Sequence, residues 1–495
     1  MHLRTIIAVA AAKAALNACH LTGRPGSSLP GRAALKTNPH IIASLASQIR
    51  RGIIVTCGTN GKTTTNNLLC SALEAQGFRV VSNRLGANMM EGIAAALATA
   101  ANPFGHLDAD YACLEIDEAS SAHVLHYLHP DYMIITNLFR DQLDRYGEID
   151  LTMKALEKAI RLAPDMKLVI NGDDPLTAFL AKKSAHHVIS FGISEKVADP
   201  HQTSCAQTSC AQTSPSTEVR EGRFCENCGS PLQYDFYHFS QLGVYRCPAC
   251  GFGRPAINYD ASGVRLAPQL SFDIREADAS NAPSDSSAPQ EFRSVSVRIN
   301  SPLTGFYNVY NILAVYSVLR EMNLSTDRLG DVLRDFRPQF GRGEVFHVGA
   351  HTGKPGGEKA GNLDGEDAPQ KVLLNLAKNP AGFNQNISAM LQDRAPKDLI
   401  IVINDNAQDG RDVSWLWDVD FDRLADETIR SITVSGLRVL DMRLRLKYVE
   451  IASDVAPSVE EAIDRCLADG CGNLYVLVNY TALYEAHKYL EGIQK

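Results

Sequence analysis

Short apolar runs alternate with helical stretches through the N-terminal half of the chain. The runs have the length and composition of buried strands and lie at 53–57, 111–116, 132–137 and 167–172. Helical stretches follow the first run and also lie at 89–100, 119–128 and 150–163. Strands that alternate with helices in this way predict a parallel sheet with helices on both of its faces.

The same alternation returns towards the C-terminus. The segment 294–322 reads as a strand, a turn and a helix. Further apolar runs that we expect to be strands, each separated from the next by a helical stretch, lie at 371–377, 398–405, 431–436, 447–452 and 473–480. This part of the chain therefore predicts a second α/β unit.

Polar segments of low complexity interrupt the pattern at 196–220, 276–292 and 350–370, and they read as inserts or linkers. A chain of 495 residues is also longer than one core usually holds. We expect an N-terminal helical lead-in at 1–48, a central domain at 49–320 with a further insert at about 221–262, and a C-terminal α/β domain at 321–495.

The first 21 residues superficially resemble a signal peptide, but Lys13 interrupts their apolar stretch. Apolar residues recur there with helical spacing, which predicts an amphipathic helix. Two placements of this helix stay open: against the body of the protein, or near a membrane surface. No apolar run reaches the roughly 18 residues that a transmembrane helix needs, so we expect none.

Composition and charge narrow the possible functions. A hydrophobic fraction of 45% and a charged fraction of 21% are typical of a globular protein. The net charge of −8 argues against nucleic acid as the main partner, because phosphate binding needs a basic excess. Twelve cysteines, of which four form two CxxC pairs, fit a reducing compartment better than a disulfide framework.

A glycine-rich turn, GTNGKTTT, joins the first strand to a helix. Such a turn presents backbone N–H groups and a helix N-terminus to phosphate, while the lysine reaches the terminal phosphates and the next hydroxyl holds Mg²⁺. The spacing is shorter than in the general GxxxxGK[ST] pattern. The positions expected to bind nucleotide are Gly58, Thr59, Asn60, Gly61, Lys62, Thr63 and Thr64.

Two carboxylates lie at the carboxyl end of the strand at 111–116, one near its last residue and one just after it, and so at the same sheet edge as the glycine-rich turn. Glu115 and Glu118, together with Thr63, supply the oxygen ligands that Mg²⁺ prefers. The alternative is that both are ordinary carboxylates at a strand end. Asn308 and Asn311 lie three residues apart on one helical face. Helix capping or packing fits that spacing, whereas a role near the nucleotide is what the family resemblance described below implies.

Four cysteines predict a metal site. Cys225 and Cys228 form one CxxC pair, Cys247 and Cys250 form the other, and a glycine follows each pair. This spacing is typical of a tetrahedral Cys₄ zinc ribbon, in which the Zn²⁺ has no open position and is structural. A redox role or a site without metal is the alternative.

Two polar clusters follow strands of the second α/β unit, at 378–384 and at 404–418. The carboxyl ends of strands are where α/β sheets place their sites. The second cluster, NDNAQDGRDVSWLWD, holds both tryptophans of the chain beside several aspartates. It can orient an incoming amine or an activated carboxylate, or it can be a structural loop with tryptophan in the core.

The compact GTNGKTTT turn resembles that of the Mur ligases and folylpolyglutamate synthetases, which use ATP to activate a carboxylate as an acyl phosphate that an amine then attacks. TNLFRDQLDRYGE (136–148) resembles the family's TN…DHLDRHG, and LTGFYNVYNILAV (303–315) resembles its GxxNxxNxxAA. The resemblance implies ATP and Mg²⁺ as cofactors, Lys62 and Glu115 as catalytic groups, and a Rossmann-like C-terminal domain. One departure is Gln142, which replaces the DHLD histidine. The family's carbamylated lysine has no unambiguous counterpart here, and Lys154 and Lys158 are candidates only.

The Mur-type core, the four-cysteine insert and the segments NPAGFNQ and DGRDVSW together resemble an amidating branch of that family. The resemblance implies amidation of the α-carboxylate of D-glutamate in the lipid II stem peptide to D-isoglutamine. It also implies a heterodimer with a GatD-type glutaminase that delivers ammonia, a cytoplasmic location at the inner membrane face, and a catalytic tail acid, which is Asp409 or Asp412.

Two other functions compete with this one. An ordinary Mur or folylpolyglutamate-type ligase would add an amino acid instead of ammonia. A regulatory P-loop protein would bind nucleotide without ligating anything. The combination of P-loop, acidic pair and asparagine helix favours catalysis over regulation.

Overall fold

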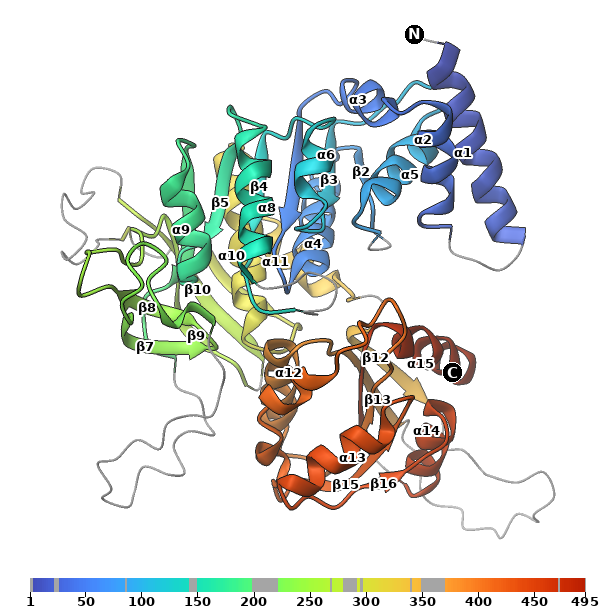
Figure 1. The fold of residues 1–495 in the computed structure, drawn as a ribbon, viewed down its shortest axis with the longest axis vertical. Helices are drawn as coiled ribbons and strands as arrows, with labels where there is room; N and C mark the ends of the chain where they lie inside the picture. The colour runs from blue at the N-terminus through green and yellow to red at the C-terminus, as the bar shows by residue number, and fades with distance from the viewer. Residues whose placement is uncertain are drawn as a thin grey trace.

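The computed structural model describes residues 3–21, 26–84, 87–141, 149–197, 221–267, 269–278, 292–293, 297–338, 341–348, 370–470 and 472–494. Its elements form two lobes (Figure 1), one built on a nine-stranded sheet and the other on a six-stranded sheet. The first lobe contains the N-terminal helices and the four-cysteine insert, and the second contains the C-terminal elements.

The sheet of the first lobe has the strand order β11-β10-β9-β6-β5-β4-β1-β3-β2. The strands from β2 to β9 are parallel, whereas β10 pairs antiparallel with both β9 and β11. The expected parallel sheet is therefore confirmed for most strands, and an antiparallel edge extends it. The bounds are β1 Gly52–Cys57, β2 Val80–Ser82, β3 Tyr111–Glu115, β4 Tyr132–Ile135, β5 Lys167–Asn171, β6 Val188–Ile193, β9 Tyr259–Arg265, β10 Leu270–Glu276 and β11 Val297–Ser301.

Helices cover both faces of this sheet, and each face has its own core. Successive side chains of a strand point to opposite faces, so Ile54 of β1 packs in one core while Ile53 and Val55 pack in the other. One face carries α4 (Lys62–Glu74), α10 (Tyr307–Glu321) and α11 (Leu329–Asp335). The other carries α5 (Met90–Ala100), α6 (Ser121–Leu125), α8 (Ile149–Arg161) and α9 (Pro175–Lys183).

Three N-terminal helices pack on α5: α1 (Leu3–Leu21), α2 (Leu29–Thr37) and α3 (Ile41–Ala46). Gly31 lets α2 lie very close to α5, because a Cβ at Gly31 would meet the Glu91 carbonyl oxygen at 1.7 Å. The body-packed placement of α1 is thus confirmed for one of its faces, where Ala8, Val9 and Ala12 are buried.

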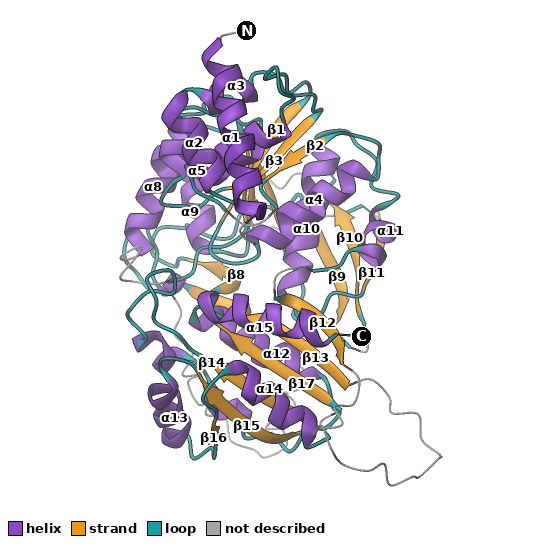
Figure 2. Cartoon of the chain, turned by 90° about the vertical axis from the view of Figure 1, so that its right-hand side faces the viewer, coloured by secondary structure: helices purple, strands orange, loops and turns teal. Residues whose placement is uncertain are grey.

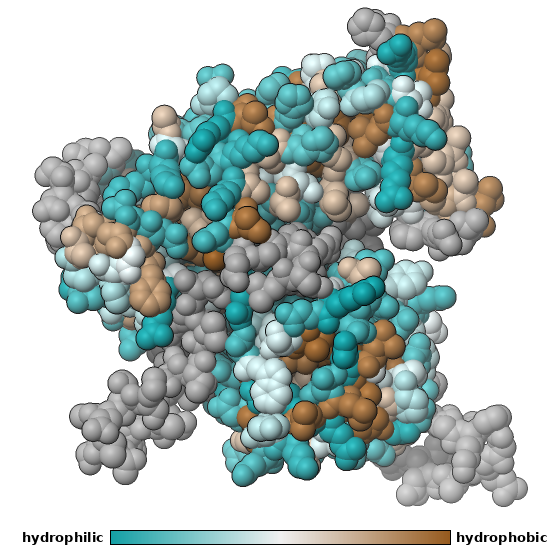
Figure 3. Space-filling view, viewed as in Figure 1, coloured by the Kyte–Doolittle hydropathy of each residue, from teal (hydrophilic) through white to brown (hydrophobic). Residues whose placement is uncertain are grey.

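The other face of α1 exposes apolar side chains. Leu3, Ile7 and Leu21 are 71%, 49% and 89% exposed, and apolar side chains gather over α1 at the upper right of Figure 3. Among the described residues, no helix has both the length and the apolar character that crossing a membrane requires.

The four-cysteine insert contains a short 3₁₀ turn, η2 (Glu221–Arg223), and a two-stranded antiparallel hairpin, β7 (Gln233–Phe239) and β8 (Leu242–Arg246). Both views place this hairpin on the side of the first lobe that faces the second lobe (Figures 1 and 2). The expected insert extended to about residue 262, but from Tyr259 onwards the chain forms β9 of the large sheet.

The second lobe has the strand order β12-β13-β17-β14-β15-β16, parallel except for β12 (Figure 2). α12 and α13 cover one face and α14 and α15 cover the other. The strands are β12 Arg342–Val348, β13 Gln370–Leu376, β14 Lys397–Val402, β15 Ile429–Ser435, β16 Asp454–Val455 and β17 Asn473–Val478. The helices are α12 Pro380–Gln392, η4 Ser414–Asp418, η5 Phe421–Leu424, α13 Val439–Tyr448, α14 Val459–Ala468 and α15 Tyr480–Ile493.

One local prediction was wrong. The segment 447–452, expected as a strand, contains the last two residues of α13, and the strand β16 begins only at Asp454. Val449 and Ile451 of this segment instead pack against the core beneath α12 and α13.

Candidate active site between the two lobes

The glycine-rich turn at 58–61 connects β1 to α4 at the carboxyl edge of the large sheet. Gly58 and Gly61 have φ angles of 119° and 84°, in the region that side chains disfavour. A Cβ at Gly61 would also lie 2.3 Å from the Asn311 Oδ1 atom. Gly61 is the N-cap of α4 and no side chain caps that end, so the first N–H groups of the helix can bind phosphate oxygens.

Lys62 is buried beside this turn and bonded to it. Its Nζ donates to the Gly58 carbonyl oxygen at 2.5 Å and to Glu118 Oε1 at 3.0 Å, and the Gly58 N–H donates to the same oxygen at 2.7 Å. Burial alone would lower the pKa of Lys62, but the carboxylates around it, above all Glu118, raise it. For Glu118 the effects have the opposite sign: burial raises the pKa of its carboxyl group, and the nearby Lys62 ammonium opposes that rise. The lysine is therefore held charged next to the turn.

Thr63 and Glu115 meet at the end of β3. The Thr63 hydroxyl donates to Glu115 Oε2 at 2.5 Å, and Asn88 Nδ2 donates to Glu115 Oε1 at 3.2 Å. Glu115 is only 3% exposed. The carboxylate and hydroxyl oxygens that meet here are of the type that binds a magnesium ion beside a phosphate.

The two asparagines of α10 pack against the same turn. Asn311 Oδ1 accepts a bond from the Thr65 hydroxyl at 3.2 Å, and Asn311 Nδ2 donates to Asn308 Oδ1 at 2.9 Å. Asn308 Nδ2 in turn donates to the Thr304 carbonyl oxygen. Asn311 lines the cavity described below. Asn308 does not line it, but its hydrogen bond holds the Asn311 side chain in place.

Side-chain contacts bond the second lobe to the P-loop region and to the loop that follows β4. Asn60 and Asn379 exchange hydrogen bonds of 3.2 and 3.4 Å. Lys378 forms an ion pair of 2.5 Å with Asp141, and Arg140 pairs with Asp418. Asn379 is also the N-cap of α12, since its Oδ1 accepts from the Gly382 N–H at 2.8 Å. The polar cluster at 378–384 thus joins the lobes at the phosphate end of the site.

A cavity of about 480 Å³ lies between the lobes and includes the P-loop. At one end it is lined by Arg32, Asn88, Glu91, Glu115 and Asp117, from the N-terminal helices and the acidic edge of the sheet. The remaining lining residues include Asn137, Phe139, Phe239, Tyr307 and Asn311 of the first lobe. The second lobe contributes Arg342, Asn375, Leu376, Lys378, Gly382, Gln385, Asn386, Gln408 and Tyr480.

The acids at the end of β3 differ in whether they line the cavity, and therefore in whether they can bind magnesium there. Glu115 and Asp117 line the cavity, whereas Glu118 does not and is bonded to Lys62 instead. Asp117 follows Glu115 by two residues, and that spacing along the strand end was the sequence signal that could have identified it. Gln142 lies outside the described residues, and Lys154 and Lys158 lie exposed on α8, away from the cavity.

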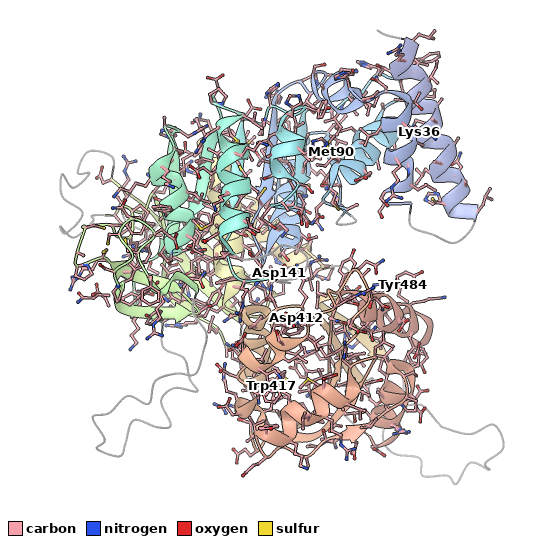
Figure 4. The ribbon with its side chains drawn as sticks, viewed as in Figure 1. Lys36, Met90, Asp141, Asp412, Trp417 and Tyr484 are labelled. Carbon is pink, nitrogen blue, oxygen red and sulfur yellow. The ribbon has the colours of Figure 1, made fainter. Side chains whose placement is uncertain are left out.

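The two tail aspartates do not line this cavity, although their neighbour Gln408 does. Asp409 is 4% exposed, and its carboxylate accepts bonds from the backbone N–H and the hydroxyl of Thr481 at the start of α15. Burial raises the pKa of Asp409. Asp412 is partly exposed, lies on the side of the second lobe that faces Asp141 (Figure 4), and accepts a bond from the Ser414 N–H. That bond, and more weakly Arg140, lowers the pKa of Asp412.

The four cysteines of the insert come together. Cys225 Sγ lies 3.6 Å from Cys250 Sγ, and Cys228 Sγ lies 3.5 Å from Cys247 Sγ. All four sulfur atoms lie within 4.8 Å of one another. Four thiolates around a zinc ion at about 2.3 Å would have sulfur–sulfur distances of about 3.8 Å, so this cluster has the size of a tetrahedral metal site. The rest of the insert places Phe239 in the cavity, which no sequence pattern indicated.

The fold and the site define a Mur ligase. The family described as "Mur ligase middle domain" matches residues 55–227, and the family described as "MurT ligase C-terminal" matches residues 376–483. A pseudomurein peptide ligase type C from Methanothermus fervidus has the same fold, with a TM-score of 0.61 at 18% identity over 92% of this chain and 81% of that chain. MurF from Thermotoga maritima, solved in complex with ADP, gives a TM-score of 0.57 at 13% identity over 93% and 84%.

Two curated relatives extend the similarity to the whole chain. The MurT subunit of lipid II isoglutaminyl synthase (glutamine-hydrolyzing) from Staphylococcus aureus (strain COL) is 33% identical over 97% of this chain and 96% of its own length. The subunit of the same name from Streptococcus pneumoniae (strain ATCC BAA-255 / R6) is 31% identical over 100% and 98%. The chain belongs to the MurT family, and the resemblance to an amidating branch of the Mur ligases is confirmed.

Proposed function

We propose that this chain is the ATP-consuming subunit of a lipid II isoglutaminyl synthase. It would amidate the α-carboxylate of D-glutamate in the stem peptide of lipid II to give D-isoglutamine. The observation that carries this proposal is the cavity between the lobes, in which Lys62, Thr63 and Glu115 lie at one sheet edge. The chain also matches a MurT subunit over 97% of its residues. A cavity that joins a phosphate-binding turn to an acid edge suits phosphorylation of a carboxylate.

The reaction would proceed in two balanced steps. A carboxylate oxygen of the acceptor attacks the γ-phosphorus of ATP and releases ADP, which leaves an acyl phosphate. The nitrogen of ammonia then attacks the acyl carbon, phosphate leaves, and the surplus proton passes to a base. Lys62 and the N–H groups of α4 would stabilise the charge on the transferred phosphoryl group.

The residues at the cavity fit a magnesium ion and those of the insert fit zinc. Thr63 and Glu115, with Asp117 nearby, would hold Mg²⁺, which neutralises the phosphate charge when bound. Glu118 would serve by holding Lys62 in place. Cys225, Cys228, Cys247 and Cys250 would hold a structural Zn²⁺, because four thiolates leave no open position.

Ammonia would come from a partner. The relatives are named subunits of a glutamine-hydrolyzing enzyme, and we propose a GatD-type glutaminase as the second subunit of a heterodimer.

Lipid II is membrane-bound, and the exposed apolar face of α1 at Leu3, Ile7 and Leu21 supports a peripheral position at the cytoplasmic membrane face. The sequence placed the boundary between the central and C-terminal domains at 320. We propose instead that it lies after α11, because α11 packs on α4 and β11 of the first lobe.

Co-expression with a GatD-type glutaminase tests the proposed function. The purified complex, given lipid II, ATP, Mg²⁺ and glutamine, is expected to convert the α-carboxylate to a carboxamide, as measured by mass spectrometry of the stem peptide. Free ammonium should replace glutamine when the chain is alone. A product that has gained a whole amino acid would instead identify an amino-acid-adding ligase, and ATP turnover without any new amide would identify a regulatory ATPase.

The tail acids give a second test. We propose that Asp412, the more exposed of the two, holds the incoming ammonium and takes up its proton, and that Asp409 positions α15 through Thr481. Asp412→Asn is expected to lower amidation by on the order of 10²-fold with either glutamine or ammonium as donor, while ATP affinity stays unchanged. Asp409→Asn should lower the midpoint of thermal unfolding as well.

Asp441→Asn, on the solvent side of α13, is the matched control for lost charge. If Asp409→Asn and Asp412→Asn both retain the full amidation rate, neither tail acid takes part and this assignment is wrong.

A further inference from the structure

The hairpin of the four-cysteine insert lies against the candidate active site. Its turn is anchored in the first lobe: Gln241 is fully buried and its Nε2 donates to the Leu138 carbonyl oxygen at 2.6 Å. The Gly243 N–H donates to the Asp173 carbonyl oxygen at 3.0 Å, and the Tyr245 hydroxyl donates to the Gly172 carbonyl oxygen at 3.2 Å. The hairpin therefore reaches the loops that follow β4 and β5, and Asn137 and Phe139 of the first of these loops line the cavity.

Phe239, the last residue of β7, lines that cavity. Its ring centroid lies 6.0 Å from that of Phe139, 5.9 Å from that of Phe306 and 6.1 Å from that of Tyr310. Phe139, Phe306 and Tyr310 are buried in the core on the α4 face, whereas Phe239 is only partly covered. The exposed remainder of its ring is an aromatic face available to a ligand in the cavity.

Gln385 of α12 lines the same cavity and carries an unsatisfied atom. The residue is 9% exposed, and its Oε1 has no hydrogen-bond partner among the described residues. Figures 1 and 2 both place α12 beside the end of the hairpin, and Ala381 of α12 belongs to the same core against which Phe239 packs. A buried amide without a partner costs free energy unless a ligand completes its bonding.

The two ends of the cavity suit different ligands. The end at Glu115, Asp117 and Arg32 is charged and suits Mg²⁺ and an anionic acceptor. Phe239 and Gln385 come from other elements, the insert hairpin and α12. A purine has a flat aromatic face and hydrogen-bonding edges, which is the chemistry that a phenyl ring and a carboxamide recognise.

We infer that the insert hairpin completes the purine subsite of the ATP site, with Phe239 as its stacking face and Gln385 as its hydrogen-bonding partner. This inference rests on the proposed use of ATP. It gives the four-cysteine cluster a role in nucleotide affinity, because the two CxxC pairs flank the hairpin at its open end. A metal ion on the four thiolates would fix the two strands that carry Phe239 to the cavity.

Equilibrium binding of ATP and of inorganic tripolyphosphate by the full chain tests this inference. Phe239→Ala is expected to raise the Kd of ATP by on the order of 10- to 100-fold and to leave the Kd of tripolyphosphate unchanged, since tripolyphosphate has no base to stack. Phe239→Trp should retain ATP affinity. Phe236→Ala, on the same strand but outside the cavity lining, is the matched control and should bind both ligands normally.

Removal of metal gives an independent arm. Wild-type protein should contain about one zinc per chain by elemental analysis, and dialysis against a chelator should raise the Kd of ATP while the Kd of tripolyphosphate changes little. Restored zinc should restore ATP affinity.

The outcomes separate this inference from the proposed function. Normal ATP binding by Phe239→Ala, or an equal loss of ATP and tripolyphosphate affinity, would overturn the role of Phe239. ATP affinity unaffected by metal removal would overturn the coupling to the four-cysteine cluster. A wild-type chain that binds neither ligand would overturn the use of ATP itself.

Discussion

Replacing Lys62 with methionine is expected to lower ATP-dependent amidation by on the order of 10³-fold. The Lys62 ammonium is the buried cation of the P-loop, and no other described side chain of the turn at 58–65 carries a positive charge. Its loss removes charge stabilisation from the phosphoryl group in the transition state. Steady-state release of ADP and formation of the amide measure the effect.

The structure also predicts a side effect of this substitution and a way to correct for it. Lys62→Met leaves the Glu118 carboxylate buried without its ion-pair partner, which costs about 3–5 kcal/mol of unfolding free energy. The double variant Lys62→Met/Glu118→Gln removes both charges and should recover most of that stability without recovering activity. Lys158→Met on α8 is the control for loss of an exposed lysine. Recovery of amidation in the double variant would contradict the catalytic role of Lys62.

Replacing Glu115 with glutamine is expected to lower the amidation rate by roughly 10²- to 10³-fold and to raise the Mg²⁺ concentration needed for half-maximal rate. Glutamine has nearly the same shape and can still accept the Thr63 hydroxyl bond, so the fold should be little affected. What it removes is the negative charge that holds the cation beside the P-loop. Rates measured across a Mg²⁺ titration separate this effect from loss of nucleotide binding.

Glu74→Gln provides the control, because Glu74 is the last residue of α4, far from the P-loop, and is paired with Arg84 at the surface. It should leave both the rate and the Mg²⁺ dependence unchanged. A Glu115→Gln variant with wild-type Mg²⁺ dependence would mean that Asp117 or another group holds the ion instead.

Much of the first lobe could be predicted from local pattern. The strands β1, β3, β4 and β5 and the helices α5 and α8 lie within a few residues of their expected positions. Their apolar runs are short, bounded by polar residues and followed by helical periodicity, so neighbouring signals agree. The three-residue strand β2 is too short to give a clear pattern, and the sequence did not predict β10, whereas β11 falls within the strand expected at the start of 294–322.

The site divides in the same way. The phosphate-binding turn could be predicted from GTNGKTTT alone, because glycines at positive φ and a helix N-terminus are set by a few consecutive residues. Whether an acid binds a metal ion or pairs with a lysine depends on the tertiary structure and not on neighbouring residues in the sequence. The structure pairs Glu118 with Lys62 and places Asp117 at the cavity. Phe239 could not be predicted for the same reason: its place in the cavity depends on where the hairpin docks. Long-range contacts, such as the bond from Gln241 to the Leu138 carbonyl oxygen, fix that position.

The sequence by itself determined the phosphate-binding turn, the alternation of strands and helices in two units, and the two cysteine pairs, because each is encoded within a few consecutive residues. Only the tertiary structure decided which side chains share the cavity. Residues as distant as Arg32, Glu115, Phe239 and Gln385 meet there because the folded sheets and the docked hairpin bring their elements together, and no spacing along the chain specifies such long-range packing.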